Sequence, residues 1–187
     1  METKEINLEK KAIKKAKRDR DAFDFLYRKY FSRINNFVFH RVKDKDVKDE
    51  IVSNTFFKAM NKIDTFELEQ YQENTFSAWL FRIAISEIGN FFRTEKKHRK
   101  VKKAIHHNQH DGKEINRQID FETVCKKLRN LSEYEQNLIT LRFFEKLKHK
   151  EIANILQQKT NTIRVQIHRT LKKLHKFLED NNYDKKI

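Results

Sequence analysis

The 187-residue chain contains no proline and only two glycines, Gly89 and Gly112. β-Hairpins and tight turns depend on these residue types, because glycine adopts a left-handed backbone readily and proline presets φ. A chain that lacks them is left with long helices and polar connections. We therefore predict an all-α fold.

Apolar residues recur at helical spacing in two blocks with a basic stretch between them. The first block ends near residue 92, and the second runs from residue 121 to residue 178. Between them, residues 93–103 carry seven Lys or Arg and one Glu. We predict two small helical domains joined by a basic polar linker, with bounds of 1–98 for the first domain, 99–120 for the linker and 121–187 for the second domain.

Charge indicates the kind of partner. Lys and Arg outnumber Asp and Glu by 42 to 27, for a formal net charge of +15, which draws the protein towards a polyanion such as nucleic acid. A lysine-rich genome bias explains part of this total but not its clustering. No segment approaches ~18 consecutive apolar residues and residues 1–17 are charged throughout, so we expect no membrane span, no secretory signal and a cytoplasmic protein.

The segment 76–93 has one broad apolar side when it is projected as a helix. Its opposite side collects Trp79, Arg82, Ser86, Asn90 and Arg93. An aromatic ring stacks on an unpaired base with roughly 1–3 kcal/mol, and Arg contacts phosphate. We predict a surface for single-stranded DNA, extended by the basic residues Lys96 and Lys97. The alternative is that Trp79 packs under a neighbouring helix and the rest is an ordinary solvated face.

The segment 47–63 has an outward face of another kind. This face combines acids with Phe and Met, and its members are Asp49, Glu50, Ser53, Phe57, Met60 and Asn61. Surface aromatics and Met beside a few charges are typical of a protein interface. We predict that it binds a protein, unless a neighbouring helix covers Phe57.

The pattern of residues 147–174 predicts a helix, a short polar turn and a second helix. On the second helix Ile163, Ile167, Leu171 and Leu174 would face inwards. The outward side is mostly cationic and consists of Thr162, Arg164, Val165, His168, Arg169, Lys172 and Lys173. Such a helix can enter the major groove, although an ordinary charged face is the alternative. Ser132 and Thr160 are the expected N-caps of two helices in this block, and Ser132 with Glu135 forms a capping-box pattern.

These three segments resemble, in order, those of a known family. Residues 49–59 (DEIVSNTFFKA), 79–86 (WLFRIAIS) and 141–174 are similar to the clamp-binding, promoter-melting and helix-turn-helix segments of the sigma-70 family of sigma factors, in the extracytoplasmic-function (ECF) group. The resemblance covers about residues 23–178. It implies that the first domain binds core RNA polymerase and the minus-ten element and that the second binds the polymerase flap and the minus-thirty-five element. It also implies an anti-sigma factor as a partner.

Several positions depart from the family pattern. Ser86 stands where Asn is common and Asn90 where Asp is frequent, while Glu50 and Ser53 replace Asp and Gln. Gln157 occupies a turn position where glycine is common, and we expect the turn to be remodelled there because Gln tolerates a left-handed backbone poorly.

Two other functions remain open at this point. A dimeric helix-turn-helix regulator would bind duplex DNA without polymerase, and it would need neither the Trp79 face nor the face around Phe57. An enzyme is the third possibility, but the sequence offers no glycine-rich phosphate loop, nucleophile elbow or paired metal motif. We therefore expect no catalytic residues, cofactor or metal, and we expect His106, His107 and His110 to be solvated linker.

Overall fold

The computed structural model describes residues 2–42, 44–68, 75–103 and 127–183, and it describes side chains in these ranges except for residues 2–3, 97–103 and 180–183. Every regular element in the described ranges is helical, which confirms the all-α prediction. Residues 104–120 of the predicted linker, with Gly112 and the three linker histidines, lie outside the described residues, as do Cys125 and the Lys97 side chain. Residues 99–103, also predicted as linker, continue helix α4 instead.

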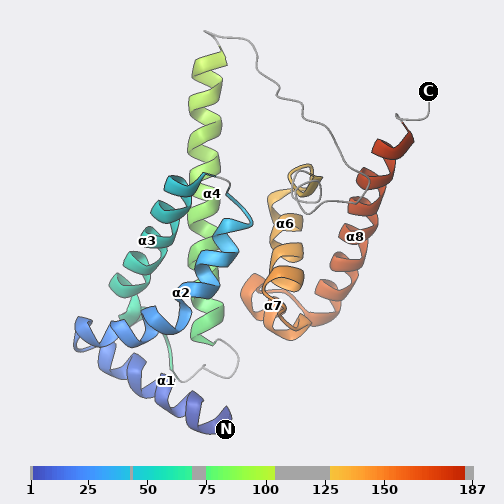
Figure 1. Ribbon diagram of the computed structural model, residues 1–187. Coiled ribbons are helices and arrows are strands. Elements are labelled where there is room, and N and C mark those ends of the chain that lie inside the picture. Colours follow the sequence, from blue (N-terminus) through green and yellow to red (C-terminus); the bar gives the residue numbers. More distant parts are fainter. Residues whose placement is uncertain (1, 43, 69–74, 104–126, 184–187) are drawn as a thin grey trace.

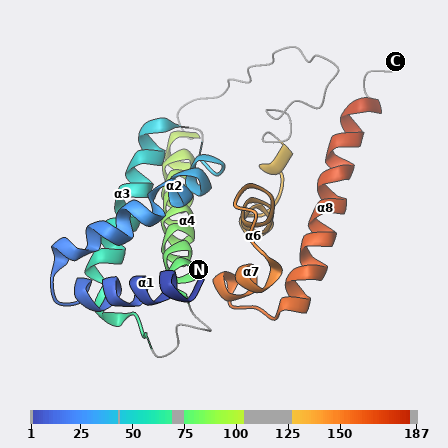
Figure 2. The same cartoon turned by 60° about the horizontal axis from the view of Figure 1, so that its bottom comes forward.

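Four helices form the first group, and α4 is its axis (Figure 1). Their bounds are α1 Glu2–Ala16, α2 Asp24–Phe39, α3 Lys45–Asn61 and α4 Phe76–Lys103, with short 3-10 turns η1 Arg20–Phe23 and η2 Ile63–Thr65. Asp44 begins α3 by accepting the amide protons of Asp46 and Val47 on its side chain. Helices α2 and α3 pack along α4, and α1 crosses below them (Figure 2).

The second group consists of α6 Glu133–Ile139, the π-helical turn η3 Thr140–Phe144, α7 His149–Leu156 and α8 Thr160–Tyr183. Ser132 is the N-cap of α6, and its reciprocal bonds with Glu135 confirm the predicted capping box. The carbonyl of Lys159 accepts the first helical bond of α8, from Ile163, so Lys159 and not Thr160 holds the N-cap position. Helices α7 and α8 form the predicted helix-turn-helix.

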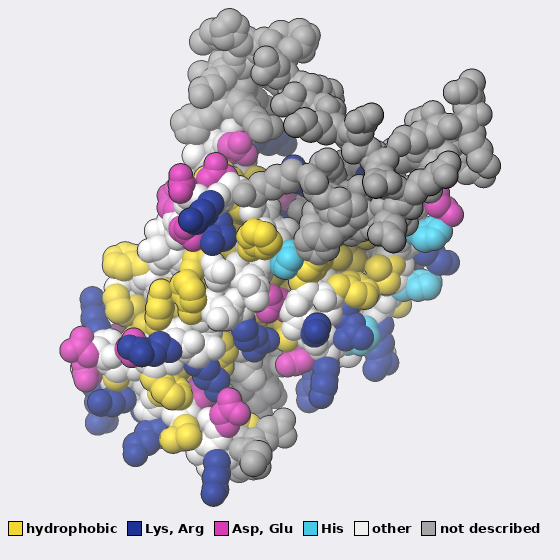
Figure 3. Space-filling view, in the orientation of Figure 1, with side chains coloured by type: hydrophobic (Ala, Val, Ile, Leu, Met, Phe, Trp, Pro, Cys, Tyr) yellow, Lys and Arg dark blue, Asp and Glu magenta, His cyan; other side chains and the backbone are white. Residues whose placement is uncertain are grey.

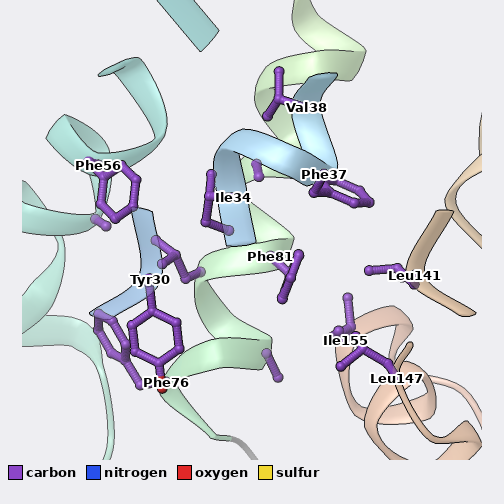
Figure 4. Close-up of a cluster of buried hydrophobic side chains, with 14 of the residues drawn as sticks. Tyr30, Ile34, Phe37, Val38, Phe56, Phe76, Phe81, Leu141, Leu147 and Ile155 are labelled. Carbon is purple, nitrogen blue, oxygen red and sulfur yellow. The ribbon is translucent and has the colours of Figure 1, made fainter. Parts of the chain in front are cut away.

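The two groups share one apolar core. Phe37 of α2 and Phe81 of α4 face Leu141 and Ile155 of the second group (Figure 4), and all four side chains are at most 3% exposed. Phe37 and Phe81 meet edge to face with ring centroids 5.3 Å apart. Burial of these side chains contributes about 1.5–3 kcal/mol each, so the contact between the groups is a substantial part of the folded state.

The length of α4 and one inward position of α8 differ from the sequence expectations. Helix α4 continues to Lys103, about ten residues beyond the end of the apolar pattern, through a basic stretch that contains no helix breaker. On α8 the inward position expected for Leu171 is taken by Thr170, which is 3% exposed and donates its hydroxyl to the Gln166 carbonyl. Leu171 is 37% exposed.

The turn around Gln157 is not remodelled. Gln157 ends α7 in the left-handed region, with φ 53° and ψ 46°. The amides of Gln157 and Gln158 both bond to the Ala153 carbonyl, which closes the helix end in the way that glycine usually allows. The expectation was wrong because these hydrogen bonds offset the cost of about 1–2 kcal/mol that a side chain incurs in this conformation.

Candidate nucleic-acid and protein interfaces

A pocket of about 470 Å³ lies on α4 where the sequence predicted a single-strand surface. Trp79, Arg82, Ser86 and Asn90 all line it, at successive turns of the helix. The opposite wall comes from the end of α3, with Lys58 and Lys62. We call these six residues, with Ile83 and Glu87, the Trp79 pocket. The structure thus brings four of the predicted DNA-contacting residues together and adds two cations.

Trp79 is half-buried and is not a fully exposed ring. Its indole lies 5.5 Å from the ring of Phe66 and 5.4 Å from that of Phe76, both of which are at most 1% exposed. One side of Trp79 packs on the core, as the alternative expected, while the side chain still lines the pocket. Its contact with single-stranded DNA stays a prediction. A ring held in this way loses little freedom on stacking against a base.

The polar groups of the Trp79 pocket are engaged with one another. Lys58 donates to Glu87 over 2.7 Å, Asn90 donates to the same carboxylate over 3.4 Å, and Arg93 donates to the Asn90 side-chain oxygen. Glu87 is only 8% exposed, so this network fixes its carboxylate at the back of the pocket. Lys96 is exposed one turn further along α4.

Arg82 connects the Trp79 pocket to the second group of helices. Its Nη1 donates to the backbone carbonyl of Asn154 in α7 over 3.0 Å. Partial burial lowers the pKa of Arg82 from its ordinary value, and the side chain remains a cation near neutral pH. One of the five donors of Arg82 is thus engaged by the Asn154 carbonyl, which links the Trp79 pocket to α7.

A groove of about 640 Å³ runs between α2 and α3. It contains four of the six residues of the face predicted to bind a protein: Asp49, Ser53, Phe57 and Met60. Phe57 is 59% exposed, whereas Met60 is half-buried. Glu50 is exposed but does not line the groove. We call this cavity the α2–α3 groove.

The α2 wall of this groove was not predicted from the sequence. Tyr27 and Phe31 line it and are 39% and 37% exposed, and their rings lie 5.2 Å apart. The signal was present, since two large aromatics four residues apart share one helix face and only one of the two faces of α2 can be buried. Figure 3 shows apolar side chains gathered over this part of the surface.

The outer face of α8 agrees with the prediction for a DNA-reading helix. Arg164, Val165, His168, Arg169 and Lys172 are exposed and Thr162 is half-buried. We call these six residues the recognition face. Within the described part of the chain, no hydrogen bond or ion pair engages Arg164, Arg169 or Lys172. Lys173 was predicted to belong to this face, but it pairs with Glu135 of α6 over 2.9 Å.

The contact between the two groups carries charged side chains. Arg33 of α2 lies 3.9 Å from Glu145, and burial raises the pKa of Glu145 to about 7 although Arg33 lowers it. Arg41 is 8% exposed and reaches the Glu133 carbonyl over 3.5 Å, and burial lowers its pKa to about 10. Helix periodicity could not indicate these pairs, because each joins residues that are more than ninety positions apart.

Known proteins share these features across the chain. Residues 26–98 match the family described as Sigma-70 region 2, and residues 126–174 match Sigma-70, region 4. The chain is 30% identical over 136 residues to the RNA polymerase sigma factor SigV of Bacillus subtilis (strain 168), which spans 72% of this chain and 78% of SigV. It is 26% identical over 174 residues to the RNA polymerase sigma factor YlaC of the same strain, spanning 90% of this chain and 98% of YlaC.

A solved structure shows the same fold. The sigma factor RpoE, in a co-crystal with the anti-sigma factor NepR from Bartonella quintana, has a TM-score of 0.64 at 20% identity and covers 84% of this chain and 96% of that chain. Two helical groups, one of which carries a helix-turn-helix, are the arrangement of a DNA-binding protein. The chain belongs to the sigma-70 family of RNA polymerase sigma factors, in its ECF group. It functions as a sigma factor, which directs transcription initiation at promoters.

Proposed function

We propose that each of the three surfaces described above has a separate binding role in this sigma factor. The α2–α3 groove docks on core RNA polymerase, the recognition face reads the minus-thirty-five element as duplex, and the Trp79 pocket captures unpaired bases of the minus-ten element. The observation that carries the proposal is the pocket itself, because residues from successive turns of α4 meet there around a single tryptophan.

The chemistry of the Trp79 pocket suits single-stranded DNA. The indole offers a stacking platform, Ser86 and Asn90 offer hydrogen bonds to base edges, and Lys62 at the rim offers a cation to the backbone. Arg82, Arg93, Lys96 and Lys97 extend the phosphate track along α4. Stacking is available only to an unpaired base, so this surface favours the melted promoter and shifts the equilibrium towards it.

The chemistry of the α2–α3 groove suits a protein. Its centre is aromatic, with Phe57 and Tyr27, and its edge carries Asp49 in a chain whose net charge is +15. An apolar centre with a charged edge is the usual arrangement of an interface, and an acidic edge repels DNA. Glu50 lies just outside the groove and adds to the acidic edge.

The recognition face suits the major groove. Arg164 and Arg169 present guanidinium groups that can bond two acceptors of guanine, while Lys172 holds phosphate. His168, Val165 and Thr162 complete the face, and Val165 offers an apolar contact for a thymine methyl group. The face is convex and exposed, as insertion into a groove requires.

Several broader statements belong to the same proposal. We divide the chain into a region 2 domain over residues 1–98, a linker over 99–120 and a region 4 domain over 121–187. The protein acts without catalysing a reaction of its own and works in the cytoplasm. An anti-sigma factor is a further partner, supported by the RpoE relative that was crystallised with one. Among the described helices none is long and apolar enough to cross a bilayer.

The dimeric regulator is the alternative from the sequence, and it is not favoured. It requires neither the Trp79 pocket nor the α2–α3 groove, yet both are formed. Both domains of the chain match sigma-70 regions, whereas a regulator would need only the second.

Co-elution with core RNA polymerase tests the proposed docking surface. We expect the wild-type chain to co-elute on size exclusion and Phe57→Ala to weaken binding about ten-fold, as removal of a central aromatic contact does. Phe39→Ala is the matched control, because Phe39 is 55% exposed but lies outside the groove. Equal binding by both variants would place the docking surface elsewhere.

A further inference from the structure

Helix α1 is tied to the turn that follows α3. Lys17, one residue past the end of α1, donates from Nζ to the carbonyl oxygens of Asp64 (3.2 Å) and Phe66 (2.6 Å). Carbonyl groups at the end of a helix lack partners within the helix, and a cation is favoured there. Lys17 supplies two hydrogen bonds to a turn that lies nearly fifty residues away in the sequence.

The bond to Phe66 affects Trp79 directly. Phe66 is 1% exposed, and its ring lies 5.5 Å from the indole of Trp79 at an interplanar angle of 59°. A fully packed ring cannot shift independently of its own backbone. The position of the Phe66 carbonyl, which Lys17 holds, therefore sets one wall against which the indole rests.

The opposite part of α1 supports the other ring beside Trp79. Tyr30 donates its hydroxyl to Glu9 over 2.6 Å, and its ring lies 5.5 Å from Phe76 (Figure 4), which in turn lies 5.4 Å from the indole. Glu9 is 2% exposed, so this bond is shielded from water. Both rings that flank Trp79 are thus linked to α1, although α1 itself does not line the Trp79 pocket.

We propose that Lys17 is a positioning residue for promoter melting, which holds Phe66 and thereby orients Trp79 to stack on an unpaired base. This inference rests on the proposed role of the Trp79 pocket. Neither the net charge nor the helix periodicity marks Lys17, because it is one of 42 Lys and Arg and only the fold brings it to this turn.

Trp79 is the only tryptophan of the chain, so the tryptophan fluorescence of the wild type reports on this one side chain. Lys17→Met removes the ammonium group and keeps an unbranched side chain. We expect a red shift of the Trp79 emission and stronger quenching by acrylamide. We also expect about ten-fold weaker binding of a fluorescein-labelled, mixed-sequence single-stranded oligodeoxynucleotide, measured by anisotropy on the full chain.

Three variants make this test specific. Lys14→Met removes the same charge from an exposed position of α1. We expect its Trp79 emission to match the wild type, and its oligonucleotide affinity to differ from the wild type only by the effect of one lost charge. Lys17→Arg keeps hydrogen-bond donors at the turn, so we expect both its Trp79 emission and its oligonucleotide affinity to match the wild type. If Lys17→Met has a disordered circular dichroism spectrum, Tyr30→Phe provides the second test, because it removes the hydroxyl that bonds to Glu9 and should still shift the emission.

Each outcome separates this inference from the function on which it rests. Unchanged Trp79 emission in folded Lys17→Met, or an equal shift in Lys14→Met, would overturn the role of Lys17. A shift in Lys17→Met together with full oligonucleotide binding by Trp79→Ala would leave the positioning of the indole in place. That result would overturn instead the role of the pocket in binding single-stranded DNA.

Discussion

The Trp79 pocket and the recognition face are both cationic, yet they are built in opposite ways. The pocket is concave, its indole is half-buried, and Arg82, Lys58 and Arg93 are all bonded within the protein. The recognition face is convex, and Arg164 and Arg169 are exposed. Basic side chains line the α8 side of the molecule in Figure 3.

This difference suggests how the two surfaces use their charges. A face whose cations are exposed gains binding free energy from counterion release when it contacts duplex DNA. A cation that already has a partner in the protein gains less from a new one. We therefore expect the pocket to depend mainly on stacking and shape, which an unpaired base satisfies, and to favour single-stranded over duplex DNA.

The largest expected effect is that of Trp79→Ala in the polymerase holoenzyme. Loss of one stacked base costs roughly 1–3 kcal/mol, so we expect about ten- to hundred-fold weaker binding of forked promoter DNA and a similar loss of run-off transcript. Binding of fully duplex promoter should be unchanged. Phe39→Ala is the matched aromatic control, and equal losses on forked and duplex DNA would contradict a role confined to unpaired bases.

Arg169→Ala should produce the converse pattern. Removal of one major-groove contact costs about 1–3 kcal/mol, which corresponds to about ten-fold weaker binding of a duplex that contains the minus-thirty-five element. The slope of log affinity against log salt should fall by about one. Filter binding across a salt series measures both. Arg129→Ala removes an exposed cation from another part of the second domain, and it should change neither quantity by as much.

Gln157→Gly tests whether the recognition helix is held at an energetic cost. Glycine adopts the left-handed conformation without the clash of a Cβ atom, so we expect the free energy of unfolding to rise by about 1 kcal/mol. Chemical denaturation measures this change. Gln158→Gly, one residue later and without a positive φ, should lower the free energy of unfolding. Lower stability in Gln157→Gly would show that the side chain contributes contacts of its own.

Glu145→Gln tests the contact that joins the two groups of helices. The pKa of Glu145 is raised from 4.5 to about 7 in the folded protein, so the folded state binds the proton more tightly than the unfolded state does. Stability from this group is therefore complete at low pH and declines as the pH rises towards about 7, after which it stays constant.

Glutamine imitates the protonated carboxyl group. We expect the melting temperature of the wild type, relative to that of Glu145→Gln, to fall between pH 4.5 and about pH 7 and to stay level above that. His40 lies in the same contact, and burial lowers its pKa, but its contribution is common to both proteins and cancels in the difference. A difference that does not change with pH would show that Glu145 is ionised throughout.

The sequence predicted the faces of single helices well. The inward residues Leu80, Phe81 and Ala84 of α4 and the outward residues Phe57 and Arg164 are where the periodicity places them. Periodicity succeeds here because a helix in a small domain has one side to bury. It cannot say which element covers that side, and a helix with many aromatic residues offers more than one choice.

The contacts between helices could not be predicted in this way. The α2 wall of the groove, the bond from Arg82 to Asn154 and the bonds from Lys17 all join segments that are distant in the sequence. The left-handed Gln157 shows a further limit, because backbone preference is overridden where hydrogen bonds close a helix end. The roles assigned to the individual site residues remain predictions.

The most direct test of the central claim compares two variants on two forms of one promoter. Run-off transcription from pooled DNA of the source genome first identifies a promoter, and holoenzymes with Trp79→Ala and Arg169→Ala are then titrated with its duplex and forked forms. Our account predicts that Trp79→Ala loses affinity mainly for the forked form and Arg169→Ala equally for both, because both carry the upstream duplex. Equal losses by Trp79→Ala on the two forms would contradict the account.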